Sequence, residues 1–558
     1  MREYWLGALA LAAWLLSGAA APAAAQGPVR RHLVYFRDKA GTPYQVGQPA
    51  AFLSARAVAR RQRQGIAVTA RDLPVSPAYL AQVRAVPGAQ VVYPSRWLNA
   101  ALVACDSATL ARVRALPAVR QATTLSRGPR PAAPPAAPAP AQTAQQTLEL
   151  GTRPDYGKTF AQDQLIGAVA MHDAGYRGEG MQIAVFDAGF PGANAAGPLQ
   201  ALFAQQRVLG TRNFVDGGRG VYVRNSHGTN TLSLMAGEQA GVFVGTAPHA
   251  SFHLCITEDA NSERPVEEAN WLAAAEYADS VGVDVISSSL GYTSFDAPAA
   301  PHTYADLNGR TAIGSQAAVL AARAGMLVLN SAGNDGANGW HYVSVPADAD
   351  SIITVGAVDS LRRHAAFSSY GPTADGRLKP TLSAMGVASA VVTATGAVVR
   401  GNGTSYACPE LAGLAAGLWQ AHPRLSAQQI IEALTRTASQ ATAPDNALGY
   451  GIPDFTAADA YAAALVPPVA LGPPLARVQL YPNPTRTGEL RLVLPAEWQN
   501  RPLDVRIVDA RGAVVRRQTL APVGALEAVL YAGPLAKGTY LCEVSAGGQK
   551  QTVRFVQQ

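Results

Sequence analysis

Short apolar segments alternate with helix-like segments through the middle of the chain. The apolar segments have the length and composition of buried strands, and they are 182–187, 251–256, 283–287, 326–330 and 352–357. The helix-like segments are 229–236, 265–281, 315–324 and the run that follows residue 405. This alternation predicts an α/β fold in which helices flank a parallel sheet, with the functional site at the carboxyl ends of the strands.

The regions on either side have different patterns. Short strands at 32–36 and 89–93 alternate with helical runs at 51–63, 77–84 and 108–116, which predicts a small α+β layer of the ferredoxin-like kind. The C-terminal region instead contains short strands separated by turns, which predicts a small all-β sandwich. These strands are 490–494, 503–507, 513–520, 525–531 and 538–544.

Two proline-rich stretches separate these three regions. One spans 128–140, and the other contains Val466-Pro467-Pro468 and Gly472-Pro473-Pro474. Their prolines exclude a regular helix or a central strand and favour an extended linker.

The first residues have the pattern of a secretory signal peptide. Arg2 precedes a short apolar run at 6–16, and Ala23-Ala24-Ala25 offers the small residues that signal peptidase needs, so cleavage is expected near Ala25. A permanent membrane anchor is less favoured because the apolar run is short, and no later segment is long and apolar enough to span a bilayer. The resulting division is a signal peptide (1–25), an α+β domain (26–127), a linker (128–147), an α/β domain (148–465), a linker (466–475) and a β-sandwich (476–558).

Composition supports several globular domains. The chain has 558 residues, 48% of them hydrophobic and 15% charged, which predicts about three or four domains rather than disorder. Between residues 26 and 130, sixteen Lys and Arg face three Asp and no Glu, a net charge of +13, whereas the whole chain carries +7. The arginines are dispersed and the aromatic residues fall mainly in apparent core elements, so nucleic acid is not expected as a partner. The acidic remainder of the same chain is the simpler partner.

Three polar residues have positions that suit nucleophilic catalysis. Ser405 lies at the start of an apolar helical run, where a hydroxyl is exposed and helix amides point outward. Asp187 ends a buried strand, and His227 opens a helix-like run. Each residue alone is consistent with an ordinary structural role, such as a helix cap for the serine. Together they have the chain order Asp, His, Ser, which is one of three unrelated solutions for a Ser-His-Asp triad.

Four motifs in this order resemble the subtilisin-like serine peptidases over about 151–464. They are 185–189 (Val-Phe-Asp-Ala-Gly), His227-Gly228-Thr229, 330–334 (Asn-Ser-Ala-Gly-Asn) and 403–409 (Gly-Thr-Ser-Tyr-Ala-Cys-Pro). The resemblance implies a subtilisin-like fold and catalytic roles for Asp187, His227 and Ser405. The chain departs from many members at Ala188 and Tyr406, and neither position handles a proton.

The resemblance also implies further site residues. Asn334 matches the side chain that binds the oxyanion, although Asn beside Gly is by itself a turn residue. The segment 288–291 resembles the strand exit that pairs with substrate as an added β-strand, which gives Ser289, Leu290 and Gly291, together with Gly333, as substrate-binding residues. Main-chain pairing of this kind requires an extended substrate, so an endopeptidase acting on flexible or unfolded protein segments is expected.

The two outer domains carry resemblances of their own. The basic domain is similar to the propeptide of secreted subtilisin-like enzymes, which assists folding and blocks the cleft as an intramolecular inhibitor. An independent basic domain is the alternative. The C-terminal domain resembles the sorting domain of the type IX secretion pathway, through 481–484 (Tyr-Pro-Asn-Pro), 509–512 (Asp-Ala-Arg-Gly) and 537–540 (Lys-Gly-Thr-Tyr). A carbohydrate- or protein-binding module is the alternative there.

The four cysteines do not suggest a disulfide framework, because they are spread over domains that are expected to separate on processing. No His and Cys spacing suggests zinc. Calcium is common in the family, but no ligand set can be assigned from the sequence, so no cofactor is predicted beyond a family expectation of calcium.

The resulting hypothesis is a secreted or surface-attached serine endopeptidase, made as a zymogen, that hydrolyses proteins through an acyl-enzyme. Its expected partners are protein substrates, its own propeptide and the secretion machinery. One alternative is a catalytically inactive relative that serves as a surface binding or adhesion protein. A sedolisin-type peptidase, which uses a glutamate base, is disfavoured by His227-Gly228-Thr229.

Overall fold

A computed structural model describes residues 27–125, 153, 155–465, 478–485, 487–495, 498, 500–522 and 527–558. The chain forms two compact units, Met1–Leu465 and Val466–Gln558, and each is described by itself. The expected signal peptide and both linkers lie outside the described residues. Within the first unit we call residues 27–125 the N-terminal region and residues 153–465 the central region.

The N-terminal region is one antiparallel sheet with helices. Its strands pair in the order β2-β3-β1-β4, and the chain order of strands and helices is that of a ferredoxin-like layer. The strands are β1 (Arg30–Phe36), β2 (Gln90–Ser95), β3 (Ala100–Cys105) and β4 (Val119–Thr124). The helices are α1 (Ala55–Arg63), α2 (Pro77–Arg84) and α3 (Ser107–Arg114). The expected α+β layer is therefore confirmed, although the sequence pattern did not single out β3 and β4.

The central region contains a seven-stranded parallel sheet of order β13-β12-β11-β10-β5-β9-β6. Its strands are β5 (Gln182–Asp187), β6 (Val208–Asn213), β9 (Ser251–Ile256), β10 (Val285–Ser288), β11 (Leu327–Ser331), β12 (Ile353–Val358) and β13 (Leu382–Met385). The inner strands are buried along their whole length, as expected when helices cover both faces. The predicted parallel α/β fold is confirmed.

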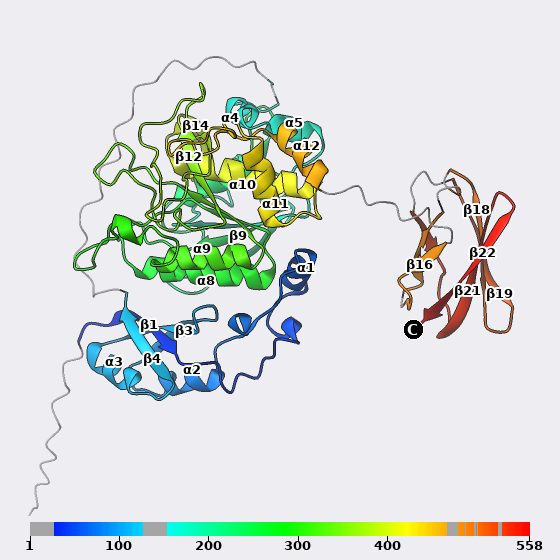
Figure 1. Cartoon of the computed structure of the whole chain (residues 1–558), viewed down its shortest axis with the longest axis horizontal. Helices are drawn as coiled ribbons and strands as arrows, with labels where there is room; N and C mark the ends of the chain where they lie inside the picture. The colour runs from blue at the N-terminus through cyan, green and yellow to red at the C-terminus, as the bar shows by residue number, and fades with distance from the viewer. Residues whose placement is uncertain are drawn as a thin grey trace, which may run out of the picture. The chain divides into compact units, whose positions relative to one another are not determined.

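Helices cover the two faces of this sheet (Figure 1). α8 (Val266–Val281) and α9 (Ile313–Arg323) pack on one face, where Trp271 of α8 meets Phe186 of β5 edge to face at 5.2 Å. α10 (Thr404–Ala421) packs on the other face, beside α7 (His227–Ala236). The remaining helices of the described central region are α4 (Phe160–Leu165), α5 (Ala168–Asp173), α6 (Gln200–Ala204), α11 (Ala427–Arg436) and α12 (Phe455–Leu465).

The second unit consists of two antiparallel sheets. One has the order β16-β17-β20 and the other β19-β18-β21-β22, and side chains from both sheets share a single apolar core. The strands are β16 (Gln479–Tyr481), β17 (Glu489–Val493), β18 (Leu503–Val508), β19 (Val514–Leu520), β20 (Glu527–Tyr531), β21 (Gly538–Ala546) and β22 (Gln549–Gln557). This confirms the expected all-β sandwich.

All four cysteines are buried and free. Burial raises the pKa of Cys105 to about 11 and the pKa of Cys408 and Cys542 to about 12, and it also raises the pKa of Cys255. The thiols are therefore protonated at neutral pH, as expected for buried structural cysteines.

Among the residues that the model describes, none of the helices has the combination of length and apolar character needed to cross a membrane.

Helix α10 approaches its neighbours closely through two glycines. A Cβ atom at Gly413 would collide with the Oγ1 atom of Thr246, and one at Gly417 would collide with the Sδ atom of Met171. The two positions are four apart and share one face of the helix. Small residues on this face therefore set how close α10 lies to α5 and to the segment before β9.

We expect Gly413→Ala to destabilise the protein by about 1–2 kcal/mol. Alanine favours a helix by about 1 kcal/mol, but the overlap with Thr246 costs about 2–3 kcal/mol because the backbone there must also shift. Denaturant unfolding, in a Ser405→Ala background that avoids self-digestion, measures the change. Gly220→Ala is the control, since a Cβ there meets open space, and equal stability of the two variants would contradict the prediction.

Candidate active site

Asp187 is a fully buried carboxylate at the last position of β5. Its Oδ1 atom accepts a hydrogen bond from the backbone amide of Ala188 at 2.8 Å, and its Oδ2 atom accepts one from the Thr231 hydroxyl at 2.9 Å. Both oxygens also lie close to His227. The carboxylate is therefore held by donors from a turn and from a helix.

His227 is the first residue of α7, and its side chain is 30% exposed. Its Nδ1 atom lies 2.8 Å from Asp187 Oδ1 and 3.0 Å from Oδ2. The next residue is Gly228, where a Cβ would collide with the carbonyl oxygen of Gly189. The glycine thus allows the helix start to approach the end of β5. Because Nδ1 faces the carboxylate, Nε2 is the nitrogen that can exchange a proton with a neighbour.

The pKa of His227 is raised above its ordinary value of 6.5. Burial lowers this pKa, but the charge of Asp187 and the hydrogen bond to it raise it by more. The imidazole is therefore a stronger base than a free histidine side chain.

Ser405 lies in the first turn of α10 and is half-buried. Its hydroxyl donates a long hydrogen bond of 3.4 Å to the carbonyl of Ser289. The next residue, Tyr406, stacks on His227 with ring centroids 6.1 Å apart, so the starts of α7 and α10 lie side by side. Ser405 and His227 thus belong to the same part of the surface, with the backbone amides of the α10 start beside them.

Asn334 lies in the loop after β11 and is exposed. Its Oδ1 atom accepts hydrogen bonds from the amide and the hydroxyl of Thr404, at 2.9 and 3.1 Å. With its oxygen held at the start of α10, the side-chain amide presents its NH₂ group as a donor. Gly333, with φ +109°, supports this loop, since a Cβ there would lie 2.8 Å from Ser369 Oγ.

The three residues expected to pair with substrate follow β10. Ser289 contacts Ser405 twice, since its hydroxyl donates to the Ser405 carbonyl at 2.8 Å and its carbonyl accepts from the Ser405 hydroxyl. The carbonyl of Leu290 accepts from the side chain of Asn330 at 2.9 Å. A Cβ at Gly291 would collide with Ser344. Ser289 and Gly333 therefore lie against the α10 start, while the role of the segment in substrate binding stays a prediction.

A group of carboxylates lies near the start of α8, of which Glu258 and Glu267 are buried and Glu263 is half-buried. One oxygen each of Glu258, Glu263 and Glu267 lies within 4.8 Å of the other two, and the Tyr292 hydroxyl donates to Glu258. Burial, and then the proximity of the other carboxylates, raises the pKa of all three. Three carboxylate oxygens at this spacing fit the oxygen ligands that Ca²⁺ prefers.

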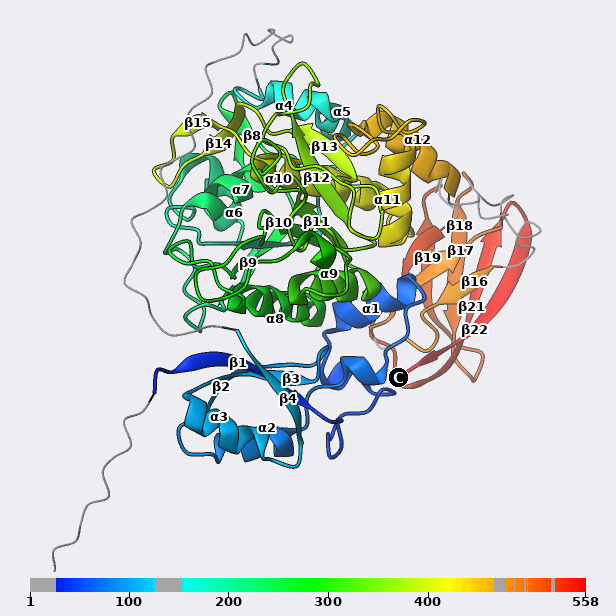
Figure 2. The ribbon, with the colours of Figure 1, turned by 60° about the vertical axis from the view of Figure 1, so that its left-hand side comes forward.

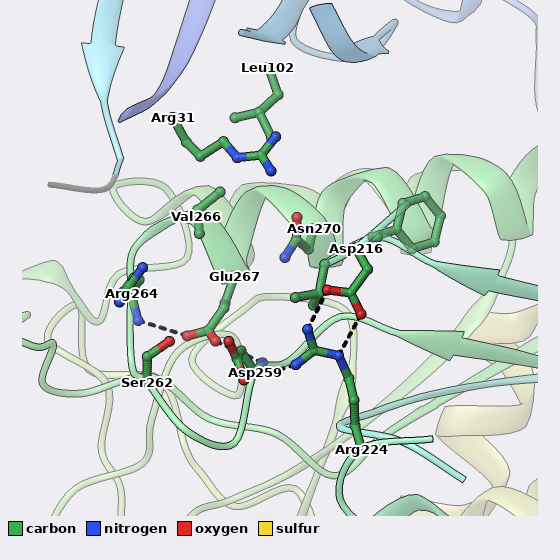
Figure 3. Close-up of a pocket in the computed structure, with 12 residues that line it drawn as sticks. Arg31, Leu102, Asp216, Arg224, Asp259, Ser262, Arg264, Val266, Glu267 and Asn270 are labelled. Carbon is green, nitrogen blue, oxygen red and sulfur yellow. Dashed lines mark hydrogen bonds and ion pairs between the residues drawn. The ribbon is translucent and has the colours of Figure 1, made fainter. Parts of the chain in front are cut away.

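A cavity of about 230 Å³ adjoins this group (Figure 3). Arg31 and Leu102 line it from the N-terminal region, and Glu267 and Asn270 of α8 line it from the central region. Arg224 bridges Asp216 and Asp259 at its wall. The cavity is therefore polar and lies between the two regions of the first unit.

Sequence reasoning did not identify Thr231 and Thr404, which organise the site, and it singled out Tyr406 only as a departure from the family motif. Thr231 is four positions after His227, so both side chains reach Asp187 from one helix face. The Thr404 hydroxyl holds Asn334, and Tyr406 packs against the imidazole. The helical spacing could have indicated Thr231, whereas the contacts of Thr404 and Tyr406 depend on tertiary packing.

Family models match three parts of the chain. A model described as the subtilase family matches residues 178–451, one described as the peptidase S8 propeptide domain of Bacteroidota matches 31–136, and one described as a secretion system C-terminal sorting domain matches 479–558. One match falls mainly in each of the three regions that the sequence pattern distinguishes.

Curated proteins with similar sequences include several bacterial subtilisins. The chain is 31% identical to subtilisin DY of Bacillus licheniformis over 278 residues, which are 49% of this chain and 89% of that protein. It is also 31% identical to subtilisin NAT of Bacillus subtilis subsp. natto over 278 residues, which are 64% of that protein. A thermostable alkaline protease of Halalkalibacterium halodurans is 28% identical over the same length.

We expect the reactivity of Ser405 to rise with pH through the raised pKa of His227. A neutral imidazole accepts the serine proton, so labelling by a fluorophosphonate is lost as the pH falls and His227 becomes protonated. Labelling rates measured from pH 5 to 9 should give an apparent pKa above the 6.5 of an unperturbed histidine. A midpoint below 6.5, or a rate that is independent of pH, would contradict this assignment.

Proposed function

The chain belongs to the subtilase family, and we propose that Asp187, His227 and Ser405 form its catalytic triad and hydrolyse peptide bonds through an acyl-enzyme intermediate. The family membership makes it a serine endopeptidase. The observation that carries the finer proposal is the Asp187–His227 contact at 2.8 Å, which lies beside the start of the helix that bears Ser405. A carboxylate, an imidazole and a serine hydroxyl are the groups that acyl transfer requires.

In the proposed first step, the Ser405 hydroxyl attacks the carbonyl carbon of the scissile peptide bond. Nε2 of His227 takes the hydroxyl proton as the bond between Oγ and carbon forms. Asp187 keeps the imidazole in the tautomer that leaves Nε2 free and stabilises the imidazolium that results. The Thr231 hydroxyl and the Ala188 amide keep the carboxylate oriented for this task.

The carbonyl oxygen becomes negative as the tetrahedral intermediate forms. We assign the side-chain NH₂ of Asn334 and the backbone amide of Ser405 as its donors. Thr404 supports this role because it holds the Asn334 oxygen and so directs the NH₂ group away from the helix. Donors that are fixed in advance stabilise the developing charge without reorganisation.

The intermediate then collapses, and His227 returns its proton to the leaving amine. Water enters, gives a proton to His227 and attacks the acyl carbon, and the product acid leaves as Ser405 regains its proton. All steps use the same three side chains, so no cofactor takes part in the bond changes.

Substrate binding is proposed along the exit of β10. Ser289, Leu290 and Gly291 would pair with an extended substrate through their main chain, and Gly333 would border the pocket for the residue before the scissile bond. The Ser289 contacts with Ser405 support this placement, since they fix the segment against the nucleophile. Flexible or unfolded segments of proteins are the substrates that this mode selects.

The outer domains indicate how the enzyme is made and where it acts. The N-terminal region is a peptidase S8 propeptide, and the C-terminal unit is a secretion sorting domain, so the protein is secreted or attached to the outer surface. We propose that the propeptide inhibits the cleft until it is released. Calcium stays a proposal, for which Glu258, Glu263 and Glu267 would be the ligands and the ion would offset their mutual repulsion.

We expect Ser405→Ala to abolish peptide hydrolysis while leaving the fold intact. The variant lacks the nucleophile but keeps the helix start, so circular dichroism should be unchanged and fluorophosphonate labelling should vanish. Digestion of an unfolded protein by the mature form measures the activity. Undiminished hydrolysis would refute the triad, and failure of the natural protein to react with the probe would favour an inactive binding protein.

We expect Asn334→Ala to lower kcat by about 10²–10³ with little change in KM, because the lost donor acts on the transition state. Asn338→Ala is the matched control. Its side chain lies in the same loop and bonds only within it, so kcat should stay within about twofold. Equal losses in both variants would show a general disturbance of the loop and would overturn the role of Asn334.

A further inference from the structure

The propeptide carries a helix whose polar face is turned toward the catalytic domain. Arg56, Arg60 and Gln64 are spaced by four residues along α1 and its end, so they share one face, and Arg61 lies beside it. All four side chains bond to atoms of the catalytic domain. In both views of the ribbon α1 lies near the end of α8 (Figure 2).

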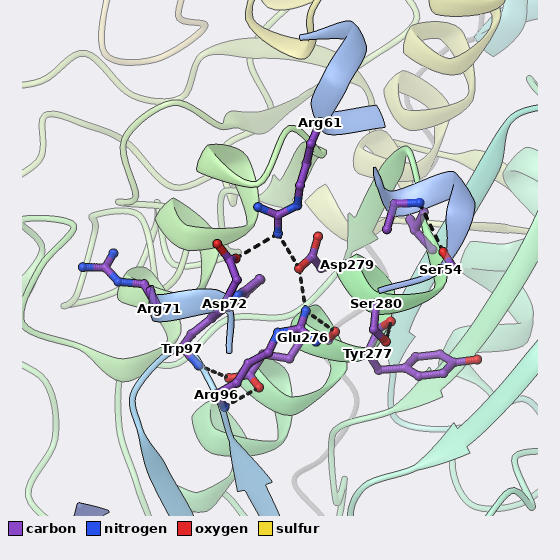
Figure 4. A network of polar contacts seen from close by, with 12 residues as sticks. Ser54, Arg61, Arg71, Asp72, Arg96, Trp97, Glu276, Tyr277, Asp279 and Ser280 are labelled. Atoms are coloured by element: carbon purple, nitrogen blue, oxygen red, sulfur yellow. Dashed lines mark hydrogen bonds and ion pairs between the residues drawn. The ribbon is translucent and has the colours of Figure 1, made fainter. Parts of the chain in front are cut away.

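The centre of this contact is Asp279 of α8, which is fully buried. Its carboxylate pairs with Arg60. It also pairs with Arg61 at 2.8 Å and with Arg96, which follows β2 (Figure 4). Burial raises the pKa of Asp279, but the three arginines bring it below its ordinary value. The Arg60 side chain is also fully buried and donates to the Val283 carbonyl, and Arg61 pairs with Asp72 as well, so these charges are compensated mainly by neighbouring protein groups.

Neighbouring atoms extend the contact. Glu276, one turn earlier in α8, accepts from the amides of Arg96 and Trp97 and from the Ser95 hydroxyl. Arg56 pairs with Asp284 and donates to the carbonyl of Gly282 at 3.0 Å. The propeptide thus meets three carboxylates of the catalytic domain at one end of α8.

The catalytic domain leaves room for α1 through two glycines. A Cβ at Gly282 would lie 2.7 Å from Arg56 Cβ, and a Cβ at Gly325 would lie 2.8 Å from Gln64 Nε2. Both have positive φ values, +89° and +88°. Gln64 also joins two segments, since it donates to the Gly325 carbonyl and accepts from the Ala427 amide.

These contacts lie near the amino ends of the strands, whereas the active site lies at their carboxyl ends. Asp284 directly precedes β10, and Gly325 comes two residues before β11, whereas Asp187 and Ser288 end their strands. A six-residue strand such as β5 spans about 17 Å, which is the approximate separation of the two ends of the sheet. Near the other end of α8, Leu33, Leu102 and Leu125 of the propeptide belong to one apolar cluster with Ala269.

We propose that Asp279 and Asp284 form a second binding site of the catalytic domain, whose ligand is the arginine-bearing helix α1 of the propeptide. This site anchors the propeptide independently of the cleft. After the chain between the propeptide and the catalytic domain is cut and the propeptide has left the cleft, this anchor keeps the propeptide bound. The rate at which the inhibitor is released therefore depends on the contact at the amino ends of the strands. The inference rests on the proposed function only in taking the cleft as the site that the propeptide blocks.

Two linked contacts hold a partner more firmly than either one alone, because the second forms within the same complex. Loss of either contact therefore leaves a bound propeptide, and only loss of both frees it. Buried hydrogen-bonded charge pairs act mainly on the rate of dissociation. The variants of this anchor should accordingly change how fast the propeptide leaves.

The test uses the full chain with Ser405→Ala and a recognition site for an unrelated protease inserted between Leu125 and Arg153. After cleavage, the catalytic domain is immobilised on a surface and the dissociation rate of the propeptide from it is measured. We expect Arg56→Ala to raise this rate about tenfold and Arg60→Met about a hundredfold or more. Asp284→Asn combined with Arg56→Ala should add little to either single change, because the two residues share one interaction.

Arg63→Ala is the matched control. It lies on the same helix, its side chain is 49% exposed, and its nearest acidic oxygen is 3.9 Å away, so its rate should stay within about twofold. If Arg60→Met prevents folding, Arg56→Ala still carries the test, because its side chain is already 34% exposed. Rates for Arg56→Ala equal to those for Arg63→Ala, or additive effects of Arg56→Ala and Asp284→Asn, overturn the proposal. The assay needs no peptidase activity, so failure of the triad would leave its result unaffected.

Discussion

The buried carboxylate of Asp187 is the group on which the arrangement of the site depends. A charge in the interior persists only when donors surround it, and here they come from the turn after β5 and from α7. Because the three donors fix the carboxylate, they also fix the start of α7 against the end of β5. The imidazole is thereby oriented before any substrate arrives, and its pKa is set by the same contact.

The sequence predicted the framework well because its signals are local. Buried parallel strands show as short apolar runs, and the expected segments 182–187 and 251–256 coincide with β5 and β9. Two departures have physical causes. α7 begins at His227 rather than at 229, because the glycine at 228 allows a close approach, and β6, with the sequence Val-Leu-Gly-Thr-Arg-Asn, is an edge strand too polar to show as an apolar run.

Site residues were predictable only where a motif carries them. The positions of Asp187, His227 and Ser405 could be read from strand ends and helix starts. The hydroxyls that hold their neighbours, Thr231 and Thr404, are common residues in unremarkable settings, and only the fold brings them to the carboxylate and the amide. The net charge of the N-terminal region pointed to an acidic partner in the same chain, but the pairing of Arg60 with Asp279 depends on tertiary structure.

The burial of the four cysteines has a consequence for export of the protein. Each is buried and almost wholly protonated at neutral pH, so neither oxidants nor other thiols find a reactive sulfur. The cysteines are then in the same thiol state on both sides of a redox boundary. An enzyme built in this way can pass from a reducing to an oxidising compartment without the help of a disulfide isomerase.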